Sequence, residues 1–303
     1  MTQDIKNVAA SIRTRLLQLA KKNREDFNFL LSRYASDRIL YRLSQSEYRH
    51  SFVLKGATLF TLWNGEPHRA TKDIDLLGFG THEVEALIEI FIKVCQQPCQ
   101  ADGIVFHAVE GEKIKEEQEY EGVRLKVKGN LGSAKITIQV DIGFGDVVTP
   151  PPVEVDMPQI LDLPTTRLQI YHQETAIAEK FQAIVSLGIA NSRVKDFYDI
   201  WFLSQNFDFQ GHLLTEAIQA TFKRRQTNVP LISPFALTEE FAKDEKTQKL
   251  WQGFIKKNKL LLNPPSFQEV IASIRQFLMP VCLEITKDED NKQMWHSSIQ
   301  RWL

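Results

Sequence analysis

The feature that most restricts how this chain folds is a glycine turn followed closely by two aspartates. Ser51–Lys55 has the composition of a short strand that ends at Gly56, and Lys72–Leu77 is a second strand that carries Asp73 and Asp75. Because side chains alternate across a strand, both aspartates are expected on the same face. Neighbouring carboxylates repel each other unless a cation lies between them. The pattern therefore predicts a metal site beside a tight backbone turn.

Paired carboxylates are good ligands for Mg²⁺ or Mn²⁺, and these ions also bind the phosphates of a substrate. A glycine-led helix start offers backbone N–H groups to the same phosphates. The candidates for contact with a nucleotide are Lys55, Gly56, Ala57 and Thr58. Metal ions held in this way can activate an attacking hydroxyl and stabilise a leaving pyrophosphate, which is nucleotidyl transfer from a triphosphate. The open alternative is that the two aspartates only pair with the nearby Arg69 and Lys72.

A third carboxylate is expected from a later strand. Lys135–Ile142 alternates cleanly between polar and apolar residues, which is typical of a strand with one buried face. Asp141 ends the polar face and is expected to join Asp73 and Asp75 as a metal ligand. Asp146, which follows the next glycine-containing turn, is the other candidate for this third position.

The charge balance excludes a global attraction to nucleic acid or membrane. The chain has 37 Lys and Arg against 38 Asp and Glu, a formal net charge of −1, so any polyanion must bind to a local patch.

No apolar stretch approaches the roughly 20 residues that span a bilayer, and residues 1–22 are typical of an amphipathic helix, not of a signal peptide. Three cysteines, an odd number, argue against a disulfide framework. We expect a cytoplasmic protein with no membrane partner.

A run of prolines separates two regions of different character. Before Thr149–Pro152, strand patterns alternate with helical ones, and after it the helical spacing of apolar residues dominates. Prolines cannot donate to a strand ladder, so this run is expected to connect two lobes. The predicted domains are residues 1–150 and residues 151–303. The predicted fold class is α+β, with a mixed-sheet lobe, a helical N-terminal extension and a helical C-terminal lobe.

Residues 221–260 are locally basic and contain three aromatic residues, Phe222, Trp251 and Phe254. Basic side chains with interspersed aromatics can bind an RNA backbone and stack unpaired bases. The alternative is an ordinary solvated helix face whose aromatics belong to the core. The basic residues of this segment are Lys223, Arg224, Arg225, Lys243, Lys246, Lys249, Lys256, Lys257 and Lys259.

Four motifs in order give the chain a family resemblance. The sequence LKGATLF, followed by RATKDIDLL, resembles the opening motifs of the nucleotidyltransferase superfamily, and more narrowly those of the AbiEii/AbiGii toxin family. Gln173–Lys180 is similar to the E-x-x-x-A-E-K helix of that family, and Lys195–Ile200 is similar to its R-D-x-Y-D helix. The chain departs from the family at Ala57, where glycine is usual, and at Lys195, where arginine is common.

The resemblance implies a minimal nucleotidyltransferase fold and a role for each matching residue. Gly56, Ala57 and Thr58 would lie against the triphosphate, and Asp73 and Asp75 would bind Mg²⁺. Lys180 would contact phosphate, and Asp196 or Asp199 would position it or assist deprotonation. Without the resemblance, a lysine near two aspartates on neighbouring helices is more often a structural ion pair.

The resemblance also implies the biological setting. It indicates the toxin of a bacterial toxin–antitoxin pair, with a nucleoside triphosphate as donor, RNA such as tRNA as acceptor, and a cognate antitoxin as partner. The alternatives are a nucleotidyltransferase that modifies a small molecule or a protein side chain, and a module that binds a nucleotide without turnover. The sequence does not identify the transferred nucleotide.

Overall fold

The computed structural model describes residues 2–116, 120–188, 192–258, 260–287 and 291–303. Its internal contacts divide the chain into two units, and both are discontinuous in sequence. Unit 1 contains Met1–Glu66, Thr71–Gly145 and Val153–Ile170. Unit 2 contains Pro67–Ala70, Asp146–Pro152 and Tyr171–Leu303.

Unit 1 is built on a seven-stranded mixed sheet in the order β3-β4-β5-β2-β1-β7-β6. Its strands are β1 (Phe52–Lys55), β2 (Ile74–Gly78), β3 (Ile104–Glu116), β4 (Tyr120–Leu131), β5 (Ala134–Phe144), β6 (Val153–Met157) and β7 (Thr166–Ile170). Its helices are α1 (Thr2–Asn23), α2 (Phe27–Gln45), α3 (Leu59–Asn64), α4 (Val84–Cys95) and the 3₁₀ turn η1 (Gln100–Asp102). The pairs β2–β5 and β1–β7 are parallel, and the others are antiparallel.

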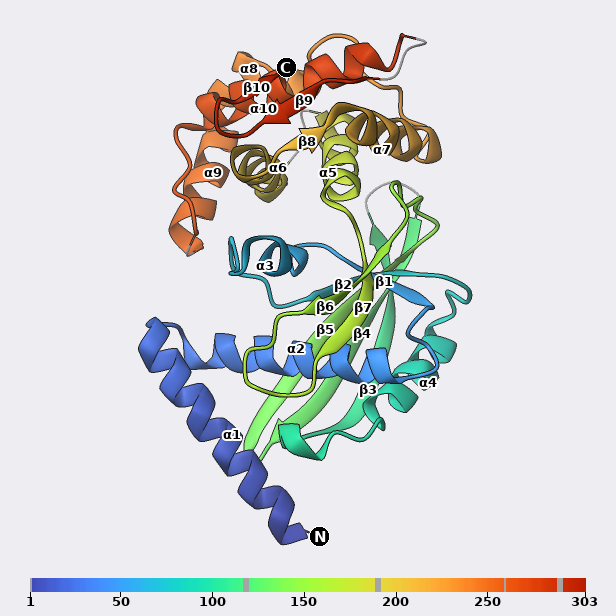
Figure 1. Cartoon of the computed structure of the whole chain (residues 1–303), viewed down its shortest axis with the longest axis vertical. Coiled ribbons are helices and arrows are strands. Elements are labelled where there is room, and N and C mark those ends of the chain that lie inside the picture. The colour runs from blue at the N-terminus through green and yellow to red at the C-terminus, as the bar shows by residue number, and fades with distance from the viewer. Residues whose placement is uncertain (1, 117–119, 189–191, 259, 288–290) are drawn as a thin grey trace. The chain divides into compact units, whose positions relative to one another are not determined.

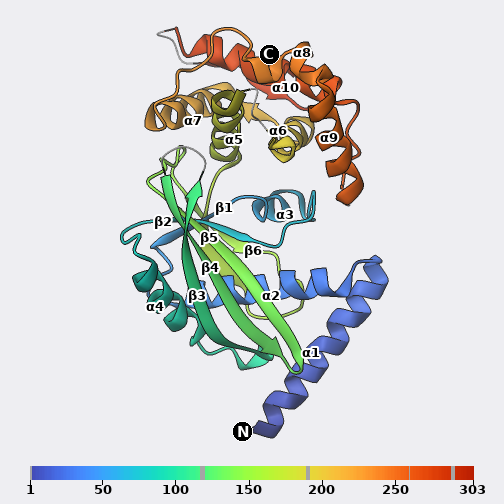
Figure 2. The same ribbon diagram turned by 180° about the vertical axis from the view of Figure 1, so that it is seen from behind.

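Helices α2 and α4 cover one face of this sheet. Helix α2 lies in front of the strands in Figure 1 and behind them in Figure 2. On β4, Leu125 points to the same side as α4, because Leu125 and the α4 residues Val84 and Ile88 together fill the space beside Gly111. The polar residues that alternate with this buried set therefore point to the opposite face, as the pattern of β5 predicted.

Unit 2 is mainly helical and has an aromatic core. Its helices are α5 (Gln173–Leu187), α6 (Val194–Asn206), α7 (Gly211–Arg224), η3 (Phe235–Leu237), α8 (Glu239–Lys243), α9 (Glu245–Lys257) and α10 (Phe267–Glu284). A small antiparallel sheet has the order β10-β9-β8, formed by β8 (Phe209–Gln210), β9 (Met294–His296) and β10 (Arg301–Trp302). Helix α10 begins at a capping box in which Ser266 and Glu269 bond each other's backbone.

The predicted α+β class is confirmed, and two strands were missed. Helical spacing was expected to dominate after the prolines, with strand patterns nearly absent, but β6 and β7 follow them and complete the sheet of unit 1. The alternation Thr166-Arg167-Leu168-Gln169-Ile170 of β7 was visible, with its first, third and fifth residues buried. Among the described residues, every helix is too short or too polar to cross a membrane.

The buried carboxyl group of Asp37 makes the stability of unit 1 depend on pH. Asp37 lies on α2 and accepts a hydrogen bond from the backbone N–H of Ile160, and its Oδ2 is buried without a hydrogen-bond partner among the described residues. Burial raises the pKa of Asp37 to about 7. The folded state therefore holds a proton that the unfolded state releases near pH 4, so this group disfavours folding as the pH rises from about 4 to about 7.

We predict that Asp37→Asn, which keeps the shape of the neutral acid, raises the free energy of unfolding by about 1–3 kcal/mol at pH 8. The same change should have little effect at pH 4. Urea unfolding at both pH values measures this, with the exposed Asp162→Asn as a control expected within about 0.5 kcal/mol of wild type. An equal effect of Asp37→Asn at both pH values would show that the carboxyl group is ionised in the folded protein.

Candidate active site

The glycine turn of unit 1 is built against the acidic strand. Strand β1 ends at Lys55, and Gly56 has a φ of 77°, in the left-handed region that favours glycine. A Cβ atom at Gly56 would lie 2.6 Å from the carboxyl carbon of Asp75, so any larger residue would displace that carboxylate. The Asp75 carboxylate therefore packs directly against the backbone of the Gly56 turn. Ala57 is buried at 5% exposure, and Thr58 makes no side-chain capping bond to α3.

Four charged side chains form a row across four neighbouring strands. Arg124 on β4 is opposite Asp141 on β5, Asp141 is opposite Asp75 on β2, and Asp75 is opposite Lys55 on β1. Residues directly opposite one another share a face, so the order across the sheet is cation, carboxylate, carboxylate, cation. We call this set the charged row.

Arg124 binds Asp141 through a bidentate ion pair. Its Nε donates to Oδ1 at 2.9 Å and its Nη2 donates to Oδ2 at 2.8 Å, while Gln139 donates to Oδ2 at 3.0 Å. The hydrogen bonds to Asp141 raise the pKa of Arg124, and the charges of Asp141 and Asp73 raise it further. The guanidinium is thus a cation close to two of the predicted metal ligands. The sequence analysis did not single out Arg124, which lies on β4 (Tyr120–Leu131).

The other two acidic candidates lie outside the charged row. Asp73 is exposed and precedes β2, which begins at Ile74, so the expectation that both aspartates lie within the strand was wrong. Asp146 belongs to unit 2, where Arg225 donates to both of its oxygens at 3.0 Å. Of the two candidates for the third carboxylate, Asp141 is the one that lies opposite Asp75.

The residues of the charged row fit a hard divalent cation. Asp75 and Asp141 offer only oxygen ligands, which Mg²⁺ and Mn²⁺ prefer, and the Arg124 guanidinium already lies beside Asp141 as a positive charge. In the described part of the chain, no three His, Cys, Asp or Glu side chains are arranged to hold a metal ion. Asp73 and Asp75 are the residues that would hold such an ion, whereas Asp141 is bonded to Arg124.

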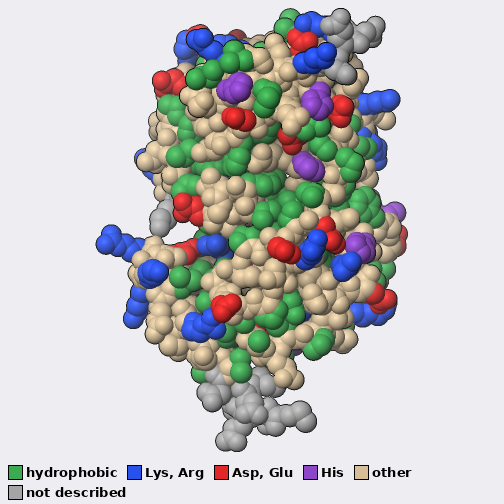
Figure 3. Space-filling model, viewed as in Figure 1, with side chains coloured by type: hydrophobic (Ala, Val, Ile, Leu, Met, Phe, Trp, Pro, Cys, Tyr) green, Lys and Arg blue, Asp and Glu red, His purple; other side chains and the backbone are tan. Residues whose placement is uncertain are grey.

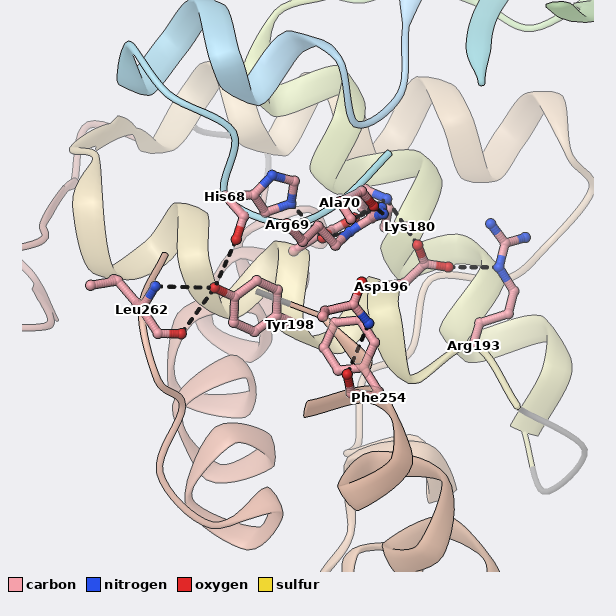
Figure 4. Close-up of polar contacts among 11 residues, drawn as sticks. His68, Arg69, Ala70, Lys180, Arg193, Asp196, Tyr198, Phe254 and Leu262 are labelled. Atoms are coloured by element: carbon pink, nitrogen blue, oxygen red, sulfur yellow. Dashed lines mark hydrogen bonds and ion pairs between the residues drawn. The ribbon is translucent and has the colours of Figure 1, made fainter. Parts of the chain in front are cut away.

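Lys180 of α5 meets Asp196 and Asp199 of α6 inside unit 2, as Figure 4 shows for Lys180 and Asp196. Its Nζ lies 2.8 Å from Asp196 Oδ1 and 2.8 Å from Asp199 Oδ2. The two aspartates are three positions apart on one helix, so their side chains share a face. Both are fully buried, whereas the Lys180 side chain keeps 14% exposure. Among the described residues, two of the three ammonium donors of Lys180 are bonded in this way, and one remains.

Two residues that precede the acidic strand complete this cluster. Arg69 donates to Asp199 through Nε at 2.7 Å and Nη2 at 2.8 Å, and His68 Nε2 lies 2.7 Å from Asp199 Oδ1. Burial lowers the pKa of His68, so the neutral ring donates its Nε2 proton to the carboxylate. Sequence reasoning considered Arg69 only as a partner of the acidic strand, whereas its bidentate ion pair is with Asp199.

A third cation, Arg193, binds Asp196 Oδ2 at 2.7 Å. Burial alone would raise the pKa of Asp199, but Arg69 and Lys180 outweigh it and hold that pKa well below its ordinary value. For Lys180 the effect of burial has the opposite sign and lowers the pKa. The charges of Asp196 and Asp199 outweigh it and bring the pKa of Lys180 above its ordinary value. A carboxylate with so low a pKa is a weak base at neutral pH. The geometry therefore favours positioning over deprotonation as the role of Asp199.

Two of the three aromatic residues in the basic segment 221–260 belong to the core, and the third, Phe254, is half-buried. Phe222 packs on Phe181 with ring centroids 5.3 Å apart, and Trp251 packs on Phe267 at 4.7 Å. Phe222 and Trp251 are buried at 0% and 2% exposure, as in the alternative that assigns the aromatics of this segment to the core. The lysines of α9, by contrast, are exposed. Lys259 lies outside the described residues.

Residues 38–273 match the nucleotidyl transferase AbiEii toxin family of type IV toxin–antitoxin systems. This match covers well over half of the 303 residues. The chain belongs to the AbiEii toxin family. Every motif that carried the resemblance in the sequence lies within the matched range, including the glycine turn, the acidic strand and both motif helices of unit 2.

Two solved structures share the fold of this AbiEii-family chain. An inferred nucleotidyltransferase from H. pylori aligns with a TM-score of 0.50 at 17% identity, covering 86% of this chain and 97% of that chain. JHP933 from Helicobacter pylori aligns with a TM-score of 0.50 at 16% identity, covering 85% of this chain and 93% of that chain. No curated protein sequence matches the chain.

We predict that Arg69→Gln lowers the free energy of unfolding by about 3 kcal/mol at pH 7, because it removes the bidentate partner of a buried carboxylate. Arg193→Gln is the matched control, since Arg193 also binds one buried aspartate but its side chain is 37% exposed. It should cost about 1 kcal/mol or less.

The stability that the ionised Asp199 carboxylate contributes to the folded protein is fully present above the ordinary pKa of an aspartate. It is lost as the pH falls through the lower pKa of Asp199 in the folded state. The difference between Arg69→Gln and wild type should therefore shrink on acidification below about pH 4. Urea unfolding from pH 3 to pH 7 measures it. Equal losses for the two arginine variants would contradict a special role for the Arg69 ion pair.

Proposed function

We propose that this protein transfers a nucleotide from a nucleoside triphosphate to an acceptor, with Mg²⁺ or Mn²⁺ held by Asp73 and Asp75 and with release of pyrophosphate. The observation that carries the proposal is the charged row, in which Asp141 lies opposite Asp75 and Asp75 lies against the Gly56 turn. Such a pair is unfavourable unless cations neutralise it. Membership of a nucleotidyl transferase family supports the same reaction.

The metal would lower the pKa of the attacking hydroxyl and offset the charge on the leaving pyrophosphate. Residues of the chain position the groups that would bind the metal and the nucleotide. Gly56 leaves room for the Asp75 carboxylate, and Lys55, Ala57 and Thr58 are proposed to contact the nucleotide. In unit 2, Asp196 and Asp199 keep the Lys180 ammonium protonated and oriented, so that its remaining donor can bind a phosphate oxygen.

The proposed acceptor is RNA, with tRNA as the first candidate, and the proposed setting is a toxin with a cognate antitoxin. The family supports the toxin role. On the face shown in Figure 3, basic and acidic side chains are interspersed, so RNA would have to bind to a local group of cations. Helix α9 offers Lys246, Lys249, Lys256 and Lys257, all of them exposed. With Phe222 and Trp251 buried, these lysines are proposed to contact the phosphate backbone.

Incubation with total bacterial RNA, Mg²⁺ and each labelled nucleoside triphosphate in turn tests the reaction. The expected result is label on RNA from one donor, and loss of at least 100-fold in rate for the double variant Asp73→Asn, Asp75→Asn. Asp162→Asn, an exposed aspartate outside the site, should keep full activity. Transfer that survives the double variant would refute the metal mechanism. Label on protein or on small molecules instead of RNA would refute the RNA acceptor.

The contribution of α9 is tested separately by changing Lys246, Lys249 and Lys256 to Glu. We expect RNA labelling to fall about tenfold or more, with a weaker dependence on salt, because fewer counterions are released on binding. The control is Lys21→Glu with Lys22→Glu, two exposed lysines near the end of α1. If both sets of variants label RNA as well as wild type does, α9 does not bind the acceptor.

A further inference from the structure

The ion pair between Arg124 and Asp141 uses most of the hydrogen-bonding capacity of a proposed metal ligand. Arg124 donates two hydrogen bonds to Asp141 and Gln139 donates a third. A carboxylate has about four lone-pair sites, so roughly one is left. A divalent ion at that remaining site would also lie next to the positive charge of the guanidinium and be repelled by it.

We propose that Arg124 and the divalent metal compete for Asp141, so that the guanidinium must leave before Asp141 can act as a metal ligand. This rests on the proposed function, because it requires the metal to bind at Asp75. With no metal bound, Arg124 neutralises one of two adjacent carboxylates and thereby relieves their repulsion. When the metal binds, it takes over this role.

Of the two cations that flank the carboxylates, Arg124 is the one able to move. Lys55 is buried at 8% exposure, whereas the Arg124 side chain is 33% exposed and its partner Asp141 15%. Arg124 can therefore swing into solvent without opening the core. A second carboxylate, that of Glu112 on β3, lies directly opposite Arg124 on the side away from Asp141 and is bonded to Lys126.

The neighbouring residue Lys126 provides a matched control. It lies two positions along β4, on the same face as Arg124, and its Nζ binds Glu112 Oε1 at 3.1 Å. Lys126→Gln removes the same charge from the same face but leaves the bonds to Asp141 in place. Comparing Lys126→Gln with Arg124→Gln therefore separates competition for Asp141 from a general change in the electrostatic field.

The test is the affinity of the full-length chain for Mn²⁺ alone, measured by electron paramagnetic resonance of the free ion, without nucleotide or RNA. We expect Arg124→Gln to tighten Mn²⁺ binding about tenfold and Lys126→Gln to change it less than about twofold. In an Asp141→Asn background, Arg124→Gln should have no more effect than Lys126→Gln. Mn²⁺ should also raise the melting temperature of Arg124→Gln more than that of wild type, which confirms that the variant folds.

Two results would overturn the inference. Unchanged or weaker Mn²⁺ binding by Arg124→Gln shows that the two cations do not compete. An effect of Arg124→Gln that persists in the Asp141→Asn background shows that Asp141 is not the shared ligand. The variant Asp75→Asn separates this inference from the proposed function. If Asp75→Asn leaves Mn²⁺ affinity unchanged, the proposed metal site itself is wrong, and competition at that site fails with it.

Discussion

The repulsion between Asp75 and Asp141 is the constraint on which the arrangement of unit 1 depends. Parallel pairing of β2 with β5 places the two carboxylates directly opposite each other, and at such separations like charges cost free energy unless they are neutralised. The fold supplies one cation on either side, Arg124 and Lys55. It also supplies Gly56, the residue without a side chain, where the Asp75 carboxylate needs space. We propose that the Arg124 cation of this row is exchanged for a metal ion.

In unit 2, the buried carboxylates are neutralised by cations within the same cluster. There, Asp196 and Asp199 are fully buried and are matched by Lys180, Arg69 and Arg193 at distances of 2.7–2.8 Å. Each carboxylate has at least two cationic partners, so each stays ionised, and the ammonium between them is fixed in direction. Such a network stabilises the fold less than an apolar core of the same volume would. What it provides is a protonated, oriented lysine that still keeps some exposure.

The sequence predicts much of this, because most of its patterns are local. Alternation along β5 gave the face of Asp141, and the three-residue spacing of Asp196 and Asp199 gave their shared face. Ion-pair partners that are distant in the sequence could not be predicted, because tertiary structure brings them together. Arg69 lies 130 positions from Asp199 in the chain, and nothing local distinguishes that pairing from one with the nearby aspartates. Arg124 was missed because its partner follows from the register of β4 on β5, which alternation alone does not fix.

The central claim is that Asp73, which precedes β2, and Asp75, which lies within it, hold a divalent metal. The most direct measurement is anomalous diffraction from crystals grown with Mn²⁺. The account predicts an anomalous peak coordinated by the carboxylates of Asp73 and Asp75, with the Arg124 guanidinium displaced from Asp141. Saturating Mn²⁺ that gives no peak at Asp73 and Asp75, while Arg124 stays on Asp141, would contradict it.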